Sequence, residues 1–246
     1  MKTDKSQIFL GLSLILLSAL FYFIHYALFR DAHHIFIYLV GDVAFVFIEV
    51  LLVTLILHQL LSYREKQAML KKMNMAIGSF FSEVGTGLMK IFSDFDLHSD
   101  KIKGDFILED DWTDQKFVSV ATAFNNYDHK IDCRQGDLND LLNFLKSKRN
   151  FLINLLQNPN LLEHESFTNL LWAVFHLTEE LESRADVGKL TDTDCEHIAG
   201  DIKRAHVLLI SEWLHYMKHL RNDYPYLFSL AKRTNPFDPN ASPEVK

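Results

Sequence analysis

The feature that most constrains this chain is a pair of long apolar runs joined by a short polar link. Residues 8–29 are almost wholly apolar, and no acid, lysine or arginine lies between Lys5 and Arg30. A second run, 35–61, is interrupted only by two acids and one histidine. A helix rises about 1.5 Å per residue, so about 20 such residues cross the hydrocarbon core of a bilayer. The link, 30–34, is short enough to force a helical hairpin.

A secretory signal peptide is the alternative explanation for the first run, because Lys2 and Lys5 precede it. The run is longer than an ordinary signal-peptide core and ends in FYFIHYALFR, without a small-x-small cleavage site. We therefore expect an uncleaved transmembrane hairpin over residues 1–62, with spans at about 8–29 and 35–61.

Basic residues flank the hairpin unequally. One side carries Lys2, Lys5, Arg64, Lys66, Lys71 and Lys72, whereas the other side carries only Arg30. The positive-inside rule then predicts a multi-pass protein of an inner or plasma membrane with both termini in the cytoplasm. We expect Arg64, Lys66, Lys71 and Lys72 to contact anionic lipid headgroups.

The rest of the chain has the pattern of an all-α protein. We expect a membrane-proximal amphipathic helix over 63–93, an acidic linker over 94–114, a cytoplasmic helical bundle over 115–234 and a tail over 235–246. Apolar residues recur at heptad spacing in the first of these segments: Leu70, Met73, Ile77, Phe80, Val84 and Ile91. This spacing fits packing on the chain's own domain, and it also fits an oligomer seam that continues the second span. Gly85 favours close backbone packing or a break there.

Capping residues and prolines mark the helices of the bundle. Thr113 or Asp114 can cap a helix that runs to about Asn126, and Asp137 can cap the next, which ends before Pro159. Further helices are expected over about 163–184, 194–222 and 226–233, with Pro225 breaking the chain before the last of them.

Several function classes lack their sequence patterns. The chain has no strand alternation of useful length, no glycine-rich phosphate loop and no nucleophile motif, so we expect neither a nucleotide partner nor an enzyme. The net charge is −7 and no basic stripe lies beyond the membrane-proximal one, which argues against nucleic acid as a partner. Cys133 and Cys195 are expected to be reduced thiols in a cytoplasmic domain, too few and too far apart for a disulfide framework.

One histidine-rich stretch, SEWLHYMKHL, could hold a divalent metal. Glu212, His215 and His219 are spaced three and four apart, and so share one face of a helix. His176 lies near Glu179 and Glu180 in a second such stretch. A di-iron bundle requires two Glu-x-x-His motifs and two further glutamates, and this chain does not supply that set. Faces of this composition are also typical of solvent-exposed helices.

Asp42 and Glu49 lie within the second apolar run, where a charged group costs at least about 2.5 kcal/mol. They are seven residues apart and so share a helix face. The first run has its own polar stripe, with Ser18, Tyr22 and His25 at helical spacing. Folding the hairpin about residue 32 brings Asp42 level with Tyr22 and His25.

Two interpretations of these polar faces stay open. In the first, Asp42 pairs with His25, and a protonated Glu49 bonds to serine, which glues the hairpin together. In the second, the faces line a wet cation path, which two helices enclose only as a homo-oligomer. We expect an oligomeric protein that forms or regulates a cation pathway, in which Asp42 and Glu49 contact the ion. The alternatives are a non-catalytic membrane-anchored scaffold that binds a cytoplasmic protein, and a metal-dependent helical-bundle enzyme.

Overall fold

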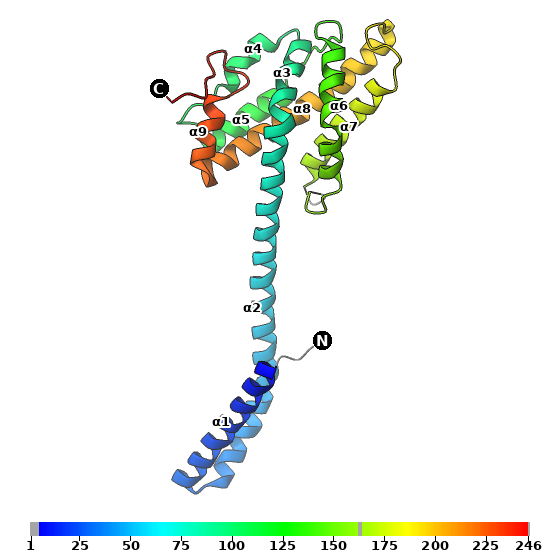
Figure 1. The fold of residues 1–246 in the computed structure, drawn as a ribbon. Coiled ribbons are helices and arrows are strands. Elements are labelled where there is room, and N and C mark those ends of the chain that lie inside the picture. The colour runs from blue at the N-terminus through cyan, green and yellow to red at the C-terminus, as the bar shows by residue number, and fades with distance from the viewer. Residues whose placement is uncertain (1–4, 162–163, 246) are drawn as a thin grey trace. The chain divides into compact units, whose positions relative to one another are not determined.

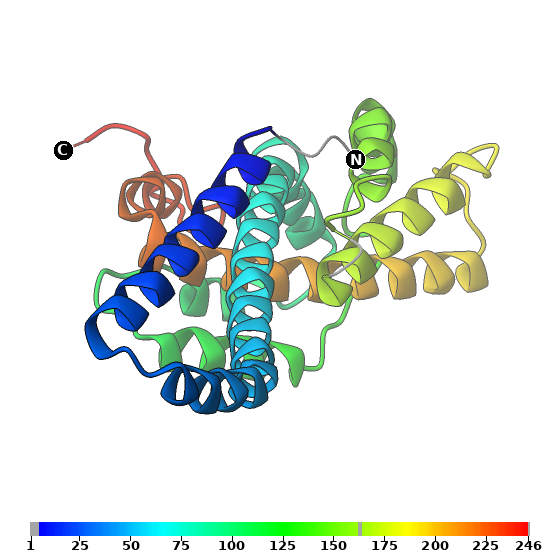
Figure 2. The same cartoon turned by 90° about the horizontal axis from the view of Figure 1, so that it is seen from below.

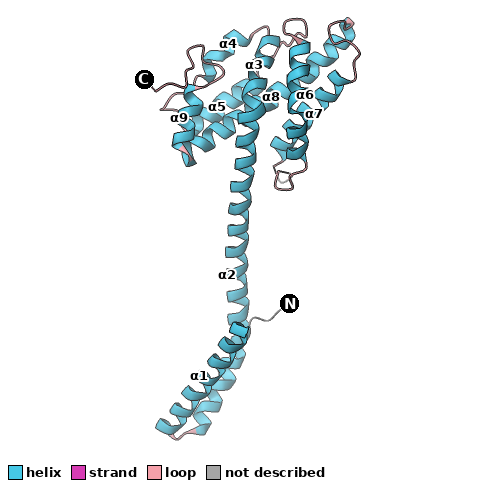
Figure 3. Cartoon of the chain, viewed as in Figure 1, coloured by secondary structure: helices cyan, strands magenta, loops and turns pink. Residues whose placement is uncertain are grey.

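The computed structural model describes residues 5–161 and 164–245. The described residues form helices joined by loops and no strand, apart from an isolated bridge that pairs Asp96 with Ile131 (Figure 3). The expected all-α class is therefore confirmed. The chain divides into two compact units, Met1–Lys66 and Gln67–Lys246. Each unit is described by itself below.

The first unit is a helical hairpin of α1 (Lys5–Phe29) and the N-terminal part of α2 (Ala32–Phe80), which run antiparallel and side by side (Figure 1). Arg30 reverses the chain from a left-handed backbone conformation, with φ 52°. The carboxylate Oδ1 of Asp31 accepts a hydrogen bond of 3.2 Å from the amide of His34 and so caps the start of α2.

Almost every large apolar side chain of the hairpin is exposed; Phe9 and Phe47, for example, are each 73% exposed. By length and composition, both helices can cross a membrane, and none of their most apolar stretch is buried within the chain. A helix that is apolar all round belongs in a protein core or in lipid. The apolar side chains of the hairpin are not buried in a protein core within this unit, so lipid is the other environment that fits them.

In the second unit, the C-terminal part of α2 packs on its own domain. Met73, Ile77, Phe80 and Val84 are buried within the chain, so these heptad side chains are not available as an oligomer seam. The segment 63–93 is not a separate helix, because α2 continues into a π-helical turn, Phe81–Gly85, and then α3 (Thr86–Phe95). A Cβ on Gly85 would lie 2.5 Å from the ring of Phe81, so the glycine permits the close packing of this turn.

The remaining helices lie close to their expected ranges. They are α5 (Asp114–Asn125), α6 (Leu138–Leu156), α7 (Glu165–Glu182), α8 (Asp192–Asp223) and α9 (Pro225–Arg233). Helix α8 begins two residues earlier than expected, after the cap Thr191, and α9 begins at Pro225 itself. The Thr113 side chain accepts a hydrogen bond from the amide of Lys116, and the Asp137 side chain accepts from two amides of the first turn of α6. The long helix α8 packs against α7, α5 and α9, and Figure 2 shows it running through the unit.

The prediction of an acidic linker over 94–114 was wrong. It holds α4 (Ser99–Lys103) and a 3-10 turn (Gly104–Phe106), and Phe106, Leu108 and Trp112 of this segment lie in the core. Burial of these three side chains outweighs the solvation of the acids around them. The expected tail also packs in part: Phe237 is buried, and Asn235 Nδ2 donates 2.7 Å to the carbonyl of Phe106.

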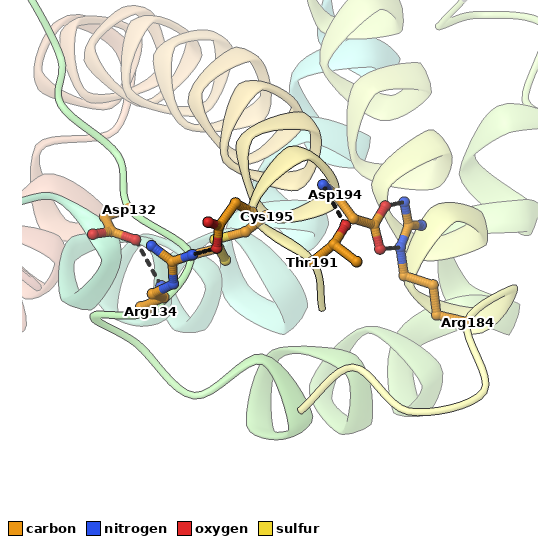
Figure 4. Close-up of a disulfide and its surroundings, with 8 residues drawn as sticks. Asp132, Arg134, Arg184, Thr191, Asp194 and Cys195 are labelled. Atoms are coloured by element: carbon orange, nitrogen blue, oxygen red, sulfur yellow. Dashed lines mark hydrogen bonds and ion pairs between the residues drawn. A yellow bond between two sulfur atoms is a disulfide. The ribbon is translucent and has the colours of Figure 1, made fainter. Parts of the chain in front are cut away.

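The prediction that both cysteines are reduced thiols was also wrong. Cys133 and Cys195 form a disulfide, with Cα atoms 5.6 Å apart across a sequence separation of 62 residues. It ties the loop before α6 to the first turn of α8, where Arg184 forms a two-pronged ion pair with Asp194 (Figure 4). The prediction was wrong because sequence spacing does not report which loops the tertiary fold brings together.

Candidate functional site

The hairpin contains a cavity of about 800 Å³ that is lined only by residues of α1 and α2. We call it the hairpin groove. Its walls are mostly aromatic and aliphatic, as in most ligand sites, with a small number of polar groups between them. The polar and titratable residues that line it are Ser18, Tyr22, His25, His34, Tyr38 and Asp42.

Histidines and a tyrosine stack across the closed end of the groove. The rings of His25 and His34 are parallel within 4°, with centroids 6.3 Å apart, and Tyr38 meets His34 edge-on at 4.7 Å. Nδ1 of His25 is buried and has no hydrogen-bond partner among the described residues. Asp42 likewise forms no ion pair or hydrogen bond within the described part of the chain. The groove therefore holds a carboxylate and imidazoles that are free to contact a ligand.

The fold-back at the hairpin turn places four of the five predicted pathway residues together. Ser18, Tyr22 and His25 line the groove from α1, and Asp42 lines it from α2. Glu49 is exposed on α2 and does not line the groove. It lies two helical turns beyond Asp42 on the same helix face.

The three predicted metal ligands on α8 do not converge. His219 Nδ1 lies 2.7 Å from Oδ2 of Asp223 and 3.4 Å from the amide of Asn74. Glu212 is buried, and its Oε1 lies 3.9 Å from His215 Nδ1. Burial acts to raise the pKa of Glu212, but its hydrogen bonds to His215 and Ser166 outweigh burial and lower it.

The hydrogen bond to Glu212 raises the pKa of His215. The two side chains therefore form an ion pair when His215 is protonated, and His219 has a different partner, Asp223. A metal site at Glu212, His215 and His219 stays a prediction without a convergent ligand set.

The four basic residues predicted to contact lipid headgroups, Arg64, Lys66, Lys71 and Lys72, are all exposed side chains of α2. Exposure leaves them available for anionic groups, and headgroup contact stays a prediction.

A buried polar cluster lies outside every sequence-based prediction. Asp96, His129 and His206 are each less than a tenth exposed. His129 Nε2 lies 2.9 Å from the carbonyl of Phe124, and its Nδ1 lies 3.7 Å from Oδ2 of Asp96. Burial lowers the pKa of His206 to about 4, so this imidazole is neutral at pH 7. The only sign of the cluster in the sequence is three isolated polar residues in separate segments.

A second missed group surrounds the disulfide. Among the described residues, Asp132, Cys133 and Cys195 are the only three metal-donor side chains whose ligand atoms lie within 4.8 Å of one another. Thiolates bind metals, whereas the sulfurs of a disulfide do not present that ligand. The pairing of the two cysteines therefore accounts for this cluster without a metal.

Comparison with known proteins gives a family for the whole chain. Residues 69–233 match the family model described as uncharacterized protein MJ1433, C-terminal helical domain, and residues 2–61 match MJ1433, N-terminal helical domain. The chain belongs to the MJ1433 family. It is 44% identical over 238 residues to uncharacterized protein MJ1433 of Methanocaldococcus jannaschii, covering 97% of this chain and 96% of that protein. No solved structure matches the chain.

The division of the MJ1433 family into two helical domains agrees with the structure. The matched regions end at 61 and begin again at 69, and the chain divides between Lys66 and Gln67. The apolar hairpin and the helical unit that follows it are thus recognisable as separate parts of the family's sequence pattern.

Proposed function

We propose that the chain is an integral membrane protein whose hairpin binds a cation in the hairpin groove, as part of an oligomeric cation pathway. The membrane placement is supported by the length and composition of the two apolar helices and by the exposure of their side chains. In water this surface would drive aggregation, whereas in lipid it is already solvated.

The single observation that carries the cation proposal is the position of Asp42. Its carboxylate lines the hairpin groove together with Ser18, Tyr22 and His25, and it has no ion-pair partner within the described residues. A charged group in a bilayer requires a partner, a wet environment or a functional role. A structural Asp42–His25 pair would remove that requirement, but no such pair is formed. A bound cation and its waters supply the missing counter-charge.

The geometry of a two-helix hairpin supports oligomerisation as part of the proposal. Two helices do not enclose a pore, and the groove is open along one side, so a continuous path requires several copies around an axis. Rings of acidic side chains attract cations in such assemblies. Glu49, two turns from Asp42 on the same helix face, is the residue that would extend the path beyond the groove.

The charges on either side of the hairpin support one orientation in the membrane. Six basic residues flank its open end and one lies at its turn, which supports a cytoplasmic location for both termini. An alkaline-phosphatase fusion at the C-terminus should then be inactive in a bacterial inner membrane. An active fusion would place the second unit outside, in the oxidising compartment where disulfides usually form.

Cation flux into liposomes tests the proposal. Asp42→Asn keeps the shape and the hydrogen-bonding capacity of the side chain but removes its charge, so flux through reconstituted protein should fall at least about tenfold. Asp31→Asn is the matched control, because it removes a carboxylate from the exposed hairpin turn and retains an oxygen that caps α2. Its flux should stay at the wild-type level.

The oligomeric state of the same detergent-purified samples decides between pathway and anchor. A monomer, or wild-type protein without cation flux at any voltage or pH, would retire the pathway. The hairpin would then be an anchor for the second unit, which would act by binding a partner protein.

A further inference from the structure

Two helices of the second unit contribute matching pairs of metal-donor side chains. On α7, His176 and Glu180 are four residues apart, and on α8, His197 and Asp201 have the same spacing. Residues four apart share one face of a helix. Helices α7 and α8 are packed together, so the two faces meet. This inference is independent of the cation pathway in the hairpin.

The four side chains form a ring in which imidazole nitrogens and carboxylate oxygens alternate. Nε2 of His176 and Nε2 of His197 each lie 3.5 Å from Oδ2 of Asp201. The same two nitrogens lie 3.8 Å and 3.5 Å from Oε1 and Oε2 of Glu180. Both histidines therefore direct the same ring nitrogen toward the same two carboxylates.

The floor of the ring holds a carboxylate oxygen that accepts no hydrogen bond from the described residues. The side chain of Asp201 is 4% exposed, and its Oδ2 is buried without a hydrogen bond among the described residues. A buried polar atom without a hydrogen bond is destabilising, and a charged one more so. Arg204 approaches the other oxygen, Oδ1, at 3.1 Å, which leaves Oδ2 directed at the two histidines.

We propose that His176, Glu180, His197 and Asp201 bind one divalent transition-metal ion that clamps α7 to α8. Two imidazoles and two carboxylates are donors that zinc and other first-row divalent ions accept. The histidine side chains are 44% and 53% exposed, so an ion can enter from solvent above the buried Asp201.

Neighbouring donors of the ring already lie close to the separation that a metal site requires, whereas opposite donors do not. In a tetrahedral zinc site with ligand distances of about 2.1 Å, neighbouring donors lie about 3.4 Å apart. Neighbours in the ring are already within a few tenths of an ångström of that value. No three of these donors lie within 4.8 Å of one another, so opposite members of the ring must approach when the ion binds. The exposed side chains of His176 and His197 and the partly exposed side chain of Glu180 supply that movement, because Asp201 is buried.

Arginine side chains around the ring contact and orient its carboxylates. Arg184 Nη1 donates 2.9 Å to Oε2 of Glu180, and Arg184 also pairs with Asp194. The hydrogen bond from Arg184 lowers the pKa of Glu180 in spite of some desolvation, so this ligand is ionised at neutral pH. Partners behind the ligands commonly orient the ligands of metal sites in this way.

Zinc binding by the full-length protein in detergent tests the proposal. The protein is stripped with a chelator and titrated with ZnCl₂ at pH 7.5, with calorimetry for affinity and elemental analysis for stoichiometry. Wild type should bind about one zinc per chain and melt at a higher temperature with zinc than without. His176→Ala and His197→Ala should each weaken binding more than about 100-fold, since even an outer partner of a ligand is worth about 10–100-fold.

Two control variants separate this site from its neighbours. Glu179→Gln removes an adjacent carboxylate of α7 that lies by Arg149 instead of the ring, and His215→Ala removes an exposed histidine of α8. Both should bind zinc like wild type. Wild-type protein that binds no zinc, or His197→Ala with unchanged affinity, overturns the proposal and leaves the ring as an ion-pair network. Loss of zinc in His215→Ala also overturns it, and places the metal at Glu212 and His215.

Discussion

The two units of this chain differ in the exposure of their large apolar side chains. In the hairpin, phenylalanines such as Phe9 and Phe47 are each 73% exposed, whereas in the second unit Phe80 and Phe92 are fully buried. The second unit removes its apolar side chains from water by folding around them. The apolar surface of the hairpin is removed from water only if something outside the hairpin covers it. The second unit therefore carries its own core, whereas the hairpin depends on its surroundings.

Truncation of a phenylalanine in each unit gives the largest expected difference. Phe92→Ala should lower the free energy of unfolding of the second unit by about 3–5 kcal/mol, because it leaves a cavity in the core. Phe47→Ala should change it by less than about 0.5 kcal/mol. Tryptophan fluorescence reports this unfolding, because Trp112, Trp172 and Trp213 all lie in the second unit. Equal effects of the two variants would contradict the division into independent units.

The disulfide should stabilise only the second unit. Cys195→Ser opens a loop of 62 residues and should lower the free energy of unfolding by about 2–4 kcal/mol. Reduction of the wild-type protein with a thiol reagent should have a similar effect in chemical denaturation. An unchanged denaturation midpoint after complete reduction would show that the cysteines do not constrain the fold.

Acid should destabilise the second unit through His206. Its folded pKa of about 4 lies below the value of 6.5 for an unfolded histidine, so the unfolded chain binds more protons between these values. The contribution of neutral His206 to the free energy of unfolding is fully present above pH 6.5. It is lost as the pH drops toward 4, by about 3 kcal/mol in total. His206→Leu should flatten this slope in denaturant titrations between pH 6.5 and 5.

Asp96 faces His206 together with His129, and the pKa of Asp96 is lowered. Asp96 therefore takes up protons mostly below the range of pH 6.5 to 5 and contributes little to the slope measured there. His25→Leu, in the hairpin, is the matched control and should keep the wild-type slope. A slope that persists in His206→Leu, or that disappears in His25→Leu, would contradict the assignment.

Local features of the fold could be predicted from sequence, whereas long-range ones could not. Thr113 and Asp137 carry capping side chains next to amphipathic periods, and both caps are formed. Phe106 and Trp112 lie among acids without helical or strand spacing, so nothing local indicated that they are buried. The Cys133–Cys195 pair depends on a tertiary contact for the same reason.

The candidate sites divide in the same way. The hairpin groove could be predicted because a short turn fixes which residues of α1 and α2 lie level with one another. The ring on α7 and α8 combines pairs from two helices, and neither His176 nor His197 has a complete ligand set on its own helix. Only the packing of α7 on α8 indicates that the two pairs belong together.

The water accessibility of the hairpin in a bilayer tests the proposed cation groove most directly. Both native cysteines are paired, so a single cysteine introduced into the hairpin is the only free thiol. In nanodiscs, Asp42→Cys should react with a water-soluble, membrane-impermeant thiol reagent, because the groove is wet. Phe47→Cys, on the exposed apolar surface, should stay unmodified. Equal protection of both positions would contradict a wet cation groove, and equal reaction of both would contradict a hairpin in lipid.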